Sequence, residues 1–187
     1  MNKIRPSSRE AILEAAFQLF SQKPAATLGD VAKHAGVGRA TLHRHFKSRE
    51  TLMVALAHAA TEELNTAVEE AVVGAASHTE GLRLTLGAVI PLANRQWFLA
   101  HEPVDSDPGV AAAYKADMAE LYHEIEAARH EGAFAPDVPT KWIAETYENL
   151  IYGAWTSVRD GDLTSAQAAD LAWRTLTVGL GGNIDKS

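Results

Sequence analysis

Apolar side chains recur along this chain every three or four residues, the spacing that places them on one face of an α-helix. The first such stretch carries Ile12, Ala15, Ala16 and Leu19. The alternation of apolar and polar residues that marks a half-buried strand is absent. The pattern therefore predicts an all-α protein of about nine helices and no sheet.

Capping residues and helix breakers divide the pattern into elements. A Ser or Thr followed three residues later by an acid or amide side chain can satisfy the first free amides of a helix, and Pro or Gly ends one. These signals predict eight main helices, over 7–23, 27–34, 39–46, 48–73, 77–100, 108–132, 137–160 and 164–180.

The second and third predicted helices are short and are joined by a turn at Gly36, which is a helix-turn-helix arrangement. Val31 and Ala32 on the second helix would face Leu42 and Phe46 on the third. With these side chains inward, the third helix turns Arg and His side chains outward, which are hydrogen-bond donors suited to the DNA major groove.

Charge is divided unevenly along the chain. The whole sequence has a formal net charge of −7, but residues 1–50 hold nine basic and four acidic residues and residues 51–187 hold eight and twenty. No carboxylate occurs between Asp30 and Glu50. A basic N-terminal region on an acidic chain favours binding of a polyanion by that region alone.

Composition excludes several classes of protein. The chain has no cysteine, so disulfides and thiolate metal sites are excluded. No signal-peptide pattern and no apolar run of membrane-spanning length occurs, so the sequence predicts a cytoplasmic protein with no membrane partner. Motifs for a nucleophile elbow, a P-loop or a dinucleotide fold are also missing, and we expect no enzyme activity and no cofactor.

The stretch "ILEAAFQLFSQKPAATLGDVAKHAGVGRATLHRHFKSRETLMVALA" resembles the DNA-binding domain of the TetR family of transcriptional regulators, over about residues 7–57. The resemblance implies a phosphate contact for Thr27, a groove-facing helix that starts at Arg39, and a phosphate contact for Arg49. Arg39 can contact guanine in a bidentate way, and Lys47 lies where the chain leaves the groove. The predicted DNA-binding residues are Thr27, Arg39, Ala40, Thr41, His43, Arg44, His45, Lys47 and Arg49.

Three positions depart from the family's usual pattern. His43 stands where a Tyr usually touches the DNA backbone, so its reach is shorter and its contact titratable. Gly29 has no side chain at a position that reads bases in some relatives. The turn after the first helix is Pro24-Ala25-Ala26 rather than a Gly-containing turn.

The resemblance divides the chain into a DNA-binding domain, residues 1–50, and a helical effector-binding and dimerisation domain, residues 51–187. Independently of it, the last two helices carry apolar residues on two faces and so need two partners, which favours a homodimer built as a four-helix bundle. Their predicted dimer residues are Ile151, Trp155, Ala169, Trp173, Leu176 and Leu180. Large aromatic and adaptable side chains suggest a ligand pocket, with Trp97, Phe98, His101, Tyr114, Met118, Tyr122, Tyr147 and Trp155 as candidates.

Together these features predict a homodimeric transcriptional repressor. It would bind a pseudo-palindromic operator in double-stranded DNA and be released by a small hydrophobic or cationic aromatic ligand. One alternative is a DNA-binding regulator or activator without a small-molecule effector. A second is a helical metal-carboxylate protein, for which Glu120 and His123 have the right spacing but no second Glu-x-x-His pair occurs.

Overall fold

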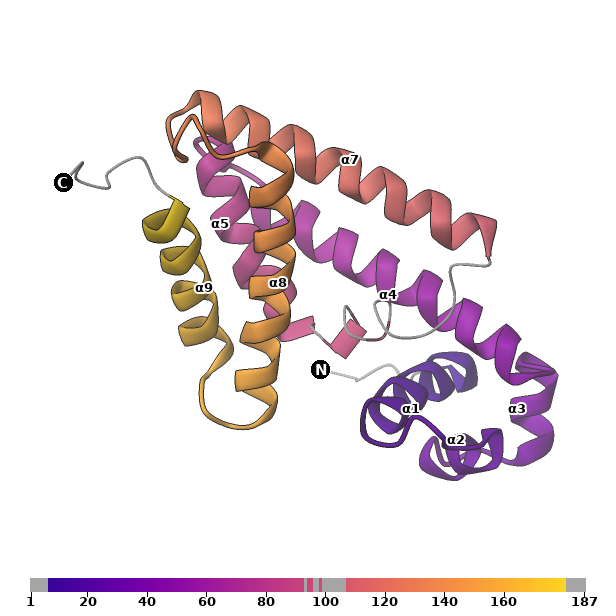
Figure 1. Cartoon of the computed structure of the whole chain (residues 1–187). Coiled ribbons are helices and arrows are strands. Elements are labelled where there is room, and N and C mark those ends of the chain that lie inside the picture. The colour runs from indigo at the N-terminus through magenta and orange to yellow at the C-terminus, as the bar shows by residue number, and fades with distance from the viewer. Residues whose placement is uncertain (1–6, 93, 96–97, 99–106, 181–187) are drawn as a thin grey trace. The chain divides into compact units, whose positions relative to one another are not determined.

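Every regular element is helical in the computed structural model, which describes residues 7–92, 94–95, 98 and 107–180 (Figure 1). This part of the chain contains eight α-helices and one 3-10 helix, which confirms the predicted all-α fold. The elements are α1 (Ser8–Gln22), α2 (Leu28–His34), α3 (Arg39–His45), α4 (Arg49–Val72), α5 (His78–Val89), η1 (Ile90–Leu92), α7 (Pro108–His130), α8 (Thr140–Arg159) and α9 (Ser165–Leu180). Among them, no helix is both long and apolar enough to cross a membrane.

Local capping sets the starts of the first two helices. The Glu10 amide donates to the Ser7 hydroxyl at 3.2 Å, and the Glu10 carboxylate accepts from the Ser7 amide at 2.8 Å. Thr27 and Asp30 repeat both bonds at the start of α2. These backbone hydrogen bonds lower the pKa of both carboxyl groups, because they favour the ionised form. Each reciprocal pair satisfies two amides that a helix leaves without partners, so the sequence specifies these starts locally.

The helix expected to continue to residue 100 is shorter than predicted. α5 ends at Val89, and a 3-10 turn over Ile90–Leu92 follows. Pro91 is the reason, because its ring removes a backbone donor and collides with the carbonyl of the preceding turn. The predicted helix is therefore interrupted before Asn94.

The chain forms two compact units, and each is described by itself. The first unit comprises residues 1–62 and 94–111, and the second comprises residues 63–93 and 112–187. The first takes in more of the chain than the predicted 1–50 domain, because Leu52 and Leu56 on α4, together with Phe98 and Val110, share one apolar core with α1, α2 and α3. The domain division at residue 50 stays a prediction.

The second unit is organised around an antiparallel pair, α8 and α9, joined by a short turn (Figure 1). α5 and η1 pack against this pair. Leu86, Ile143 and Leu176, one from each of these three α-helices, are fully buried in the contact. One of the two apolar faces predicted on the helix over 137–160 thus packs into the core of its own chain.

Candidate nucleic-acid interface

The turn between α2 and α3 is built as the helix-turn-helix prediction requires. Gly36 has a φ of +66°, a left-handed conformation that suits glycine. The Val37 amide then donates to the Ala32 carbonyl at 3.0 Å, which closes the turn. Leu42 and Phe46 are 1% and 3% exposed. Burial of these two side chains fixes which face of α3 is turned outward.

That outward face and the turn after it carry basic side chains without hydrogen-bond or ion-pair partners among the residues described. Arg39, His43, Arg44, His45 and Lys47 are all exposed. In the described part of the chain none of them makes a hydrogen bond or an ion pair, and His45 has only a ring contact with Phe46. Because unpaired guanidinium and ammonium groups keep their full set of donors, this face is prepared to bind phosphates and base edges.

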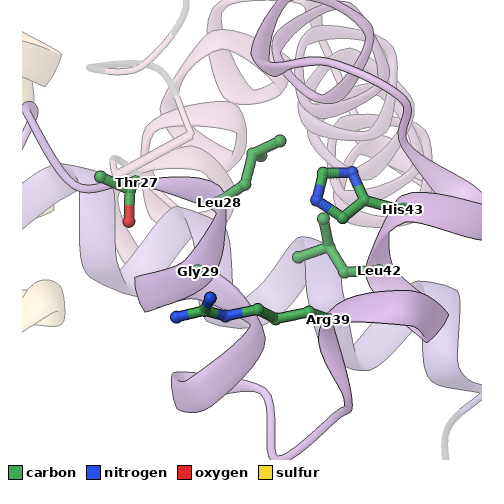
Figure 2. A pocket seen from close by; sticks show the side chains of 6 residues that line it. All are labelled: Thr27, Leu28, Gly29, Arg39, Leu42 and His43. Atoms are coloured by element: carbon green, nitrogen blue, oxygen red, sulfur yellow. The ribbon is translucent and has the colours of Figure 1, made fainter.

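A hollow of about 220 Å³ separates the start of α2 from α3 (Figure 2). Figure 2 shows the Arg39 side chain reaching from α3 towards α2 at Gly29, with His43 on the same helix. The residues around the hollow are Thr27, Leu28, Gly29, Arg39, Leu42 and His43. Three predicted DNA-binding residues are therefore brought together by the fold, although 12 positions separate Thr27 from Arg39 in the sequence.

Ala40 and Thr41 occupy the same first turn of α3 as Arg39, and the structure leaves Ala40 exposed and Thr41 half-buried. Thr27 is exposed, but its hydroxyl already donates to the Asp30 carboxylate at 2.7 Å and accepts from the Asp30 amide. A phosphate contact by Thr27 would have to exchange with this cap. The DNA roles of all three residues stay predictions.

Arg49 has partners that the sequence did not reveal. Its guanidinium donates to the Ala26 carbonyl at 2.7 Å and to the Pro24 carbonyl at 2.8 Å. It also lies 4.3 Å from the centre of the Phe20 ring, within cation–π range. Arg49 therefore holds the Pro24-Ala25-Ala26 turn onto α1, and the expected phosphate contact competes with these internal bonds.

Two described side chains between Pro91 and Pro108 contact residues of α1. Arg95, 8% exposed, donates to the Glu14 carboxylate at 2.6 Å and lies 4.4 Å from the Phe17 ring centre. Phe98, 2% exposed, meets Phe17 edge to face with ring centres 5.5 Å apart. Phe98 is thus a core residue of the first unit, and its role in ligand binding stays a prediction. No local pattern in the sequence predicts these contacts, since 81 positions separate Arg95 from Glu14.

The other predicted ligand residues that the structure describes differ in exposure. Tyr147 and Trp155 are buried in the second unit's core, where the Tyr147 hydroxyl donates to the Leu82 carbonyl at 2.8 Å. Tyr114 on α7 is 59% exposed, and Met118 and Tyr122 on the same helix are half-buried. Trp97 and His101 lie outside the described residues. The structure therefore leaves three of the predicted residues accessible, all on α7.

Burial raises the pKa of two half-buried carboxyl groups in this second unit. Burial raises the pKa of Glu148 on α8, and the nearby charge of Glu145 raises it further. Burial also raises the pKa of Asp117 on α7, against a hydrogen bond of 3.3 Å from the Asn65 side chain. Burial raises the pKa of the Tyr114 hydroxyl, and the nearby charge of Glu148 raises it further. Neither carboxylate has an ion-pair partner in the described part of the chain.

The predicted dimer residues are mostly turned inward. Ile151, Trp155 and Leu176 are 5%, 7% and 0% exposed within a single chain, so their side chains are already covered. Ala169 and Trp173 are half-buried, and the Leu180 side chain lies outside the description. The large apolar residues that are exposed on α8 and α9 are Trp142, Tyr152, Leu171 and Val178. Helical period alone could not tell the two apolar faces apart.

Metal binding has little support from the geometry. The described residues contain no group of three or more His, Asp or Glu side chains that could hold a metal ion. His123, expected as a partner of Glu120, instead lies edge to face with His78, with ring centres 6.4 Å apart. The arrangement that remains is a helix-turn-helix protein with an unpaired basic recognition surface.

Comparison with known proteins agrees with that class. Residues 12–56 match the family described as "Bacterial regulatory proteins, tetR family". The HTH-type transcriptional repressor LfrR of Mycolicibacterium smegmatis is 30% identical over 177 residues, which cover 94% of this chain and 92% of LfrR. The HTH-type transcriptional regulator NfxB of Pseudomonas aeruginosa is 26% identical over 87% of this chain and 89% of its own.

Solved structures show the same fold. The TetR-like regulator LfrR from Mycobacterium smegmatis, solved in complex with proflavine, superposes with a TM-score of 0.78 at 29% identity, covering 92% of this chain and 96% of LfrR. AibR, solved with isovaleryl coenzyme A and operator DNA, gives 0.76 at 20% identity over 91% and 98% of the two chains. The chain belongs to the TetR family of transcriptional regulators.

Proposed function

We propose that the protein is a homodimeric repressor that binds a pseudo-palindromic operator and is released by a small hydrophobic or cationic aromatic ligand. The observation that carries the DNA-binding part is the exposed surface of α3 and of the turn that follows it, where Arg39, Arg44 and Lys47 have no internal partner among the described residues. Arg39 would read a guanine edge, while Arg44 and Lys47 would fix the register on phosphates.

The dimer would form through the outer faces of α8 and α9. Leu171 and Val178 on α9 are 42% and 76% exposed, and Trp142 and Tyr152 on α8 are 59% and 44% exposed. Exposed apolar side chains gathered on two neighbouring helices favour association, and a two-fold axis would give a four-helix bundle. Such a dimer presents two α3 helices, which is the geometry that reads a palindrome.

The ligand would bind beside the half-buried Glu148 carboxylate, with Tyr114 and Tyr122 as aromatic neighbours. A carboxylate that is partly removed from water and has no described cation nearby favours a positively charged partner, and tyrosine rings add cation–π attraction. LfrR has been solved with proflavine, which supports a small-molecule ligand for this chain and makes proflavine a first compound to test.

The test begins with double-stranded DNA selected from random sequence by the full chain. Light scattering of the selected complex should give two chains per site, and a ligand that raises the melting temperature should lower DNA affinity by the same factor by which DNA lowers ligand affinity. The Leu171→Glu variant should be monomeric and bind the site at least tenfold more weakly, because a charge would be buried at the interface. Val73→Glu, at a side chain 81% exposed on the loop after α4, is the matched control. A monomeric wild-type chain on a non-repeated site would contradict the proposal.

A further inference from the structure

Gly29 and Arg39 form a close pair across the hollow between α2 and α3. A methyl group built on Gly29 would lie 3.6 Å from Arg39 Nη2 and 3.7 Å from Arg39 Nε, and also 3.6 Å from the Thr27 hydroxyl oxygen. The Arg39 guanidinium therefore lies next to the space that a side chain at position 29 would fill (Figure 2). Gly29 itself is half-buried, so this packing is partly shielded from solvent.

The guanidinium lies beside Gly29 with none of its donors in use within the described part of the chain. Arg39 makes no hydrogen bond or ion pair in the described structure. The carboxylate of Asp30, next to Gly29 in the sequence, accepts from the Thr27 amide and hydroxyl instead. Arg39 therefore keeps all its donors while the α2 backbone at Gly29 limits the directions its planar head can take.

A planar guanidinium binds two acceptors on one guanine only when its plane is aligned with the base. Holding the head against a backbone surface before DNA arrives reduces the conformational entropy lost on binding. We propose that Gly29 is a specificity-determining residue, because its lack of a side chain sets the direction in which Arg39 reads the operator. This inference rests on the proposed base-reading role of Arg39.

Substitutions at position 29 should separate by size. Gly29→Ala adds one carbon at ordinary contact distance, so Arg39 should keep its place and the selected site should not change. Gly29→Gln is a better helix former but fills the space that the guanidinium occupies. It should displace Arg39 without changing the charge of the surface.

The experiment selects double-stranded DNA from random sequence with the full-length wild type and with Gly29→Ala, Gly29→Gln, Arg39→Ala and the Gly29→Gln/Arg39→Ala double variant. Arg39→Ala should lose discrimination at one base position in each half-site by roughly 5- to 150-fold. Gly29→Gln should lose most of the preference at the same position, and the double variant should be no worse than Arg39→Ala. Gly87→Gln is the matched control, since a side chain at that helical glycine of α5 meets nothing within 4 Å. Melting curves and the salt dependence of binding to unrelated DNA show that each variant is folded.

The two possible failures are distinct. A Gly29→Gln variant that keeps the wild-type preference at the Arg39 position overturns this inference alone. So does a variant that alters a different position, with effects that add in the double variant. A wild-type chain that selects no sequence at all overturns the proposed function and the inference with it.

Discussion

The two units leave opposite charges without partners. In the first unit, Arg39, Arg44 and Lys47 on or beside α3 are exposed and unpaired in the described structure. In the second, five of the six described Lys and Arg side chains are in ion pairs, and the carboxylates of Glu148 and Asp117 remain half-buried without one. An exposed cation can contact a large polyanion at its surface, whereas a half-buried carboxylate suits a small ligand that can enter. In each unit, these side chains without a described ion-pair partner therefore have the charge that the unit's proposed partner would bind: cations for DNA in the first unit, and carboxylates for a cationic ligand in the second.

The largest expected effect tests where the two units divide. Phe98→Ala should destabilise the first unit by about 3–5 kcal/mol, because it leaves a cavity beside Phe17 in a closed core. Chemical unfolding followed by circular dichroism measures the change. Tyr114→Ala, at an exposed side chain, should shift stability by no more than about 0.5 kcal/mol. An unchanged unfolding curve for Phe98→Ala would show that residue 98 is not a core residue of the first unit and would favour its predicted role in ligand binding.

The next effect tests whether Arg49 belongs with the free cations. Loss of two charge-assisted hydrogen bonds and a ring contact in Arg49→Ala should cost about 2–3 kcal/mol of stability. Lys at this position should restore only part of it, because an ammonium group cannot bridge both carbonyls in the same plane.

Salt titration of DNA binding provides the second readout for Arg49. A phosphate contact would reduce the slope of affinity against salt concentration by about 1 in Arg49→Ala. We expect a smaller change, since the guanidinium is engaged within the protein. A full reduction with unchanged stability would place Arg49 among the DNA contacts after all.

A smaller effect tests the carboxylate of the second unit. Glu148→Gln should weaken the binding of an aromatic cation roughly tenfold, about 1.4 kcal/mol, and leave the binding of a neutral ligand of the same shape unchanged. Calorimetric titration with both ligands measures this selectivity, and Glu70→Gln on the exposed side of α4 is the control. Burial raises the pKa of Glu148, so the carboxylate becomes protonated at a higher pH than an exposed carboxyl group. As the solution is acidified, the affinity for the cation should therefore begin to fall at a higher pH. Equal losses for both ligands would show that Glu148 does not act through its charge.

The smallest effect concerns a carboxylate that does have partners. Glu131 accepts from the amides of His78 and Thr79, and the Thr79 hydroxyl and backbone bonds lower its pKa from 4.5 to about 2. A depressed pKa contributes stability that is complete above 4.5 and is lost as the pH falls towards 2. Glu131→Gln should therefore flatten the fall in melting temperature across this window. An acid limb identical to that of the wild type would show that this cap contributes nothing.

The fold could be predicted largely because its signals are local. Ser7 with Glu10, and Thr27 with Asp30, reach each other within one helical turn, so the helix starts are written in adjacent residues. Gly36 likewise fixes the turn before α3 through its own backbone. The candidate DNA-binding face followed from the same local periodicity, since burial of Leu42 and Phe46 determines what faces outward.

The sequence by itself determined the all-α class, the helix-turn-helix and the charge asymmetry, since these depend on neighbouring residues and on composition. Only the tertiary structure decided that Arg95 and Phe98 pack on α1, that Arg49 bonds to the turn before α2, and that Ile151 and Leu176 face inward while Leu171 faces outward. The physical reason is that these contacts join residues that are distant in the chain. The local sequence around an apolar face does not indicate which surface that face packs against. Which apolar residues are covered is settled only when the helices pack.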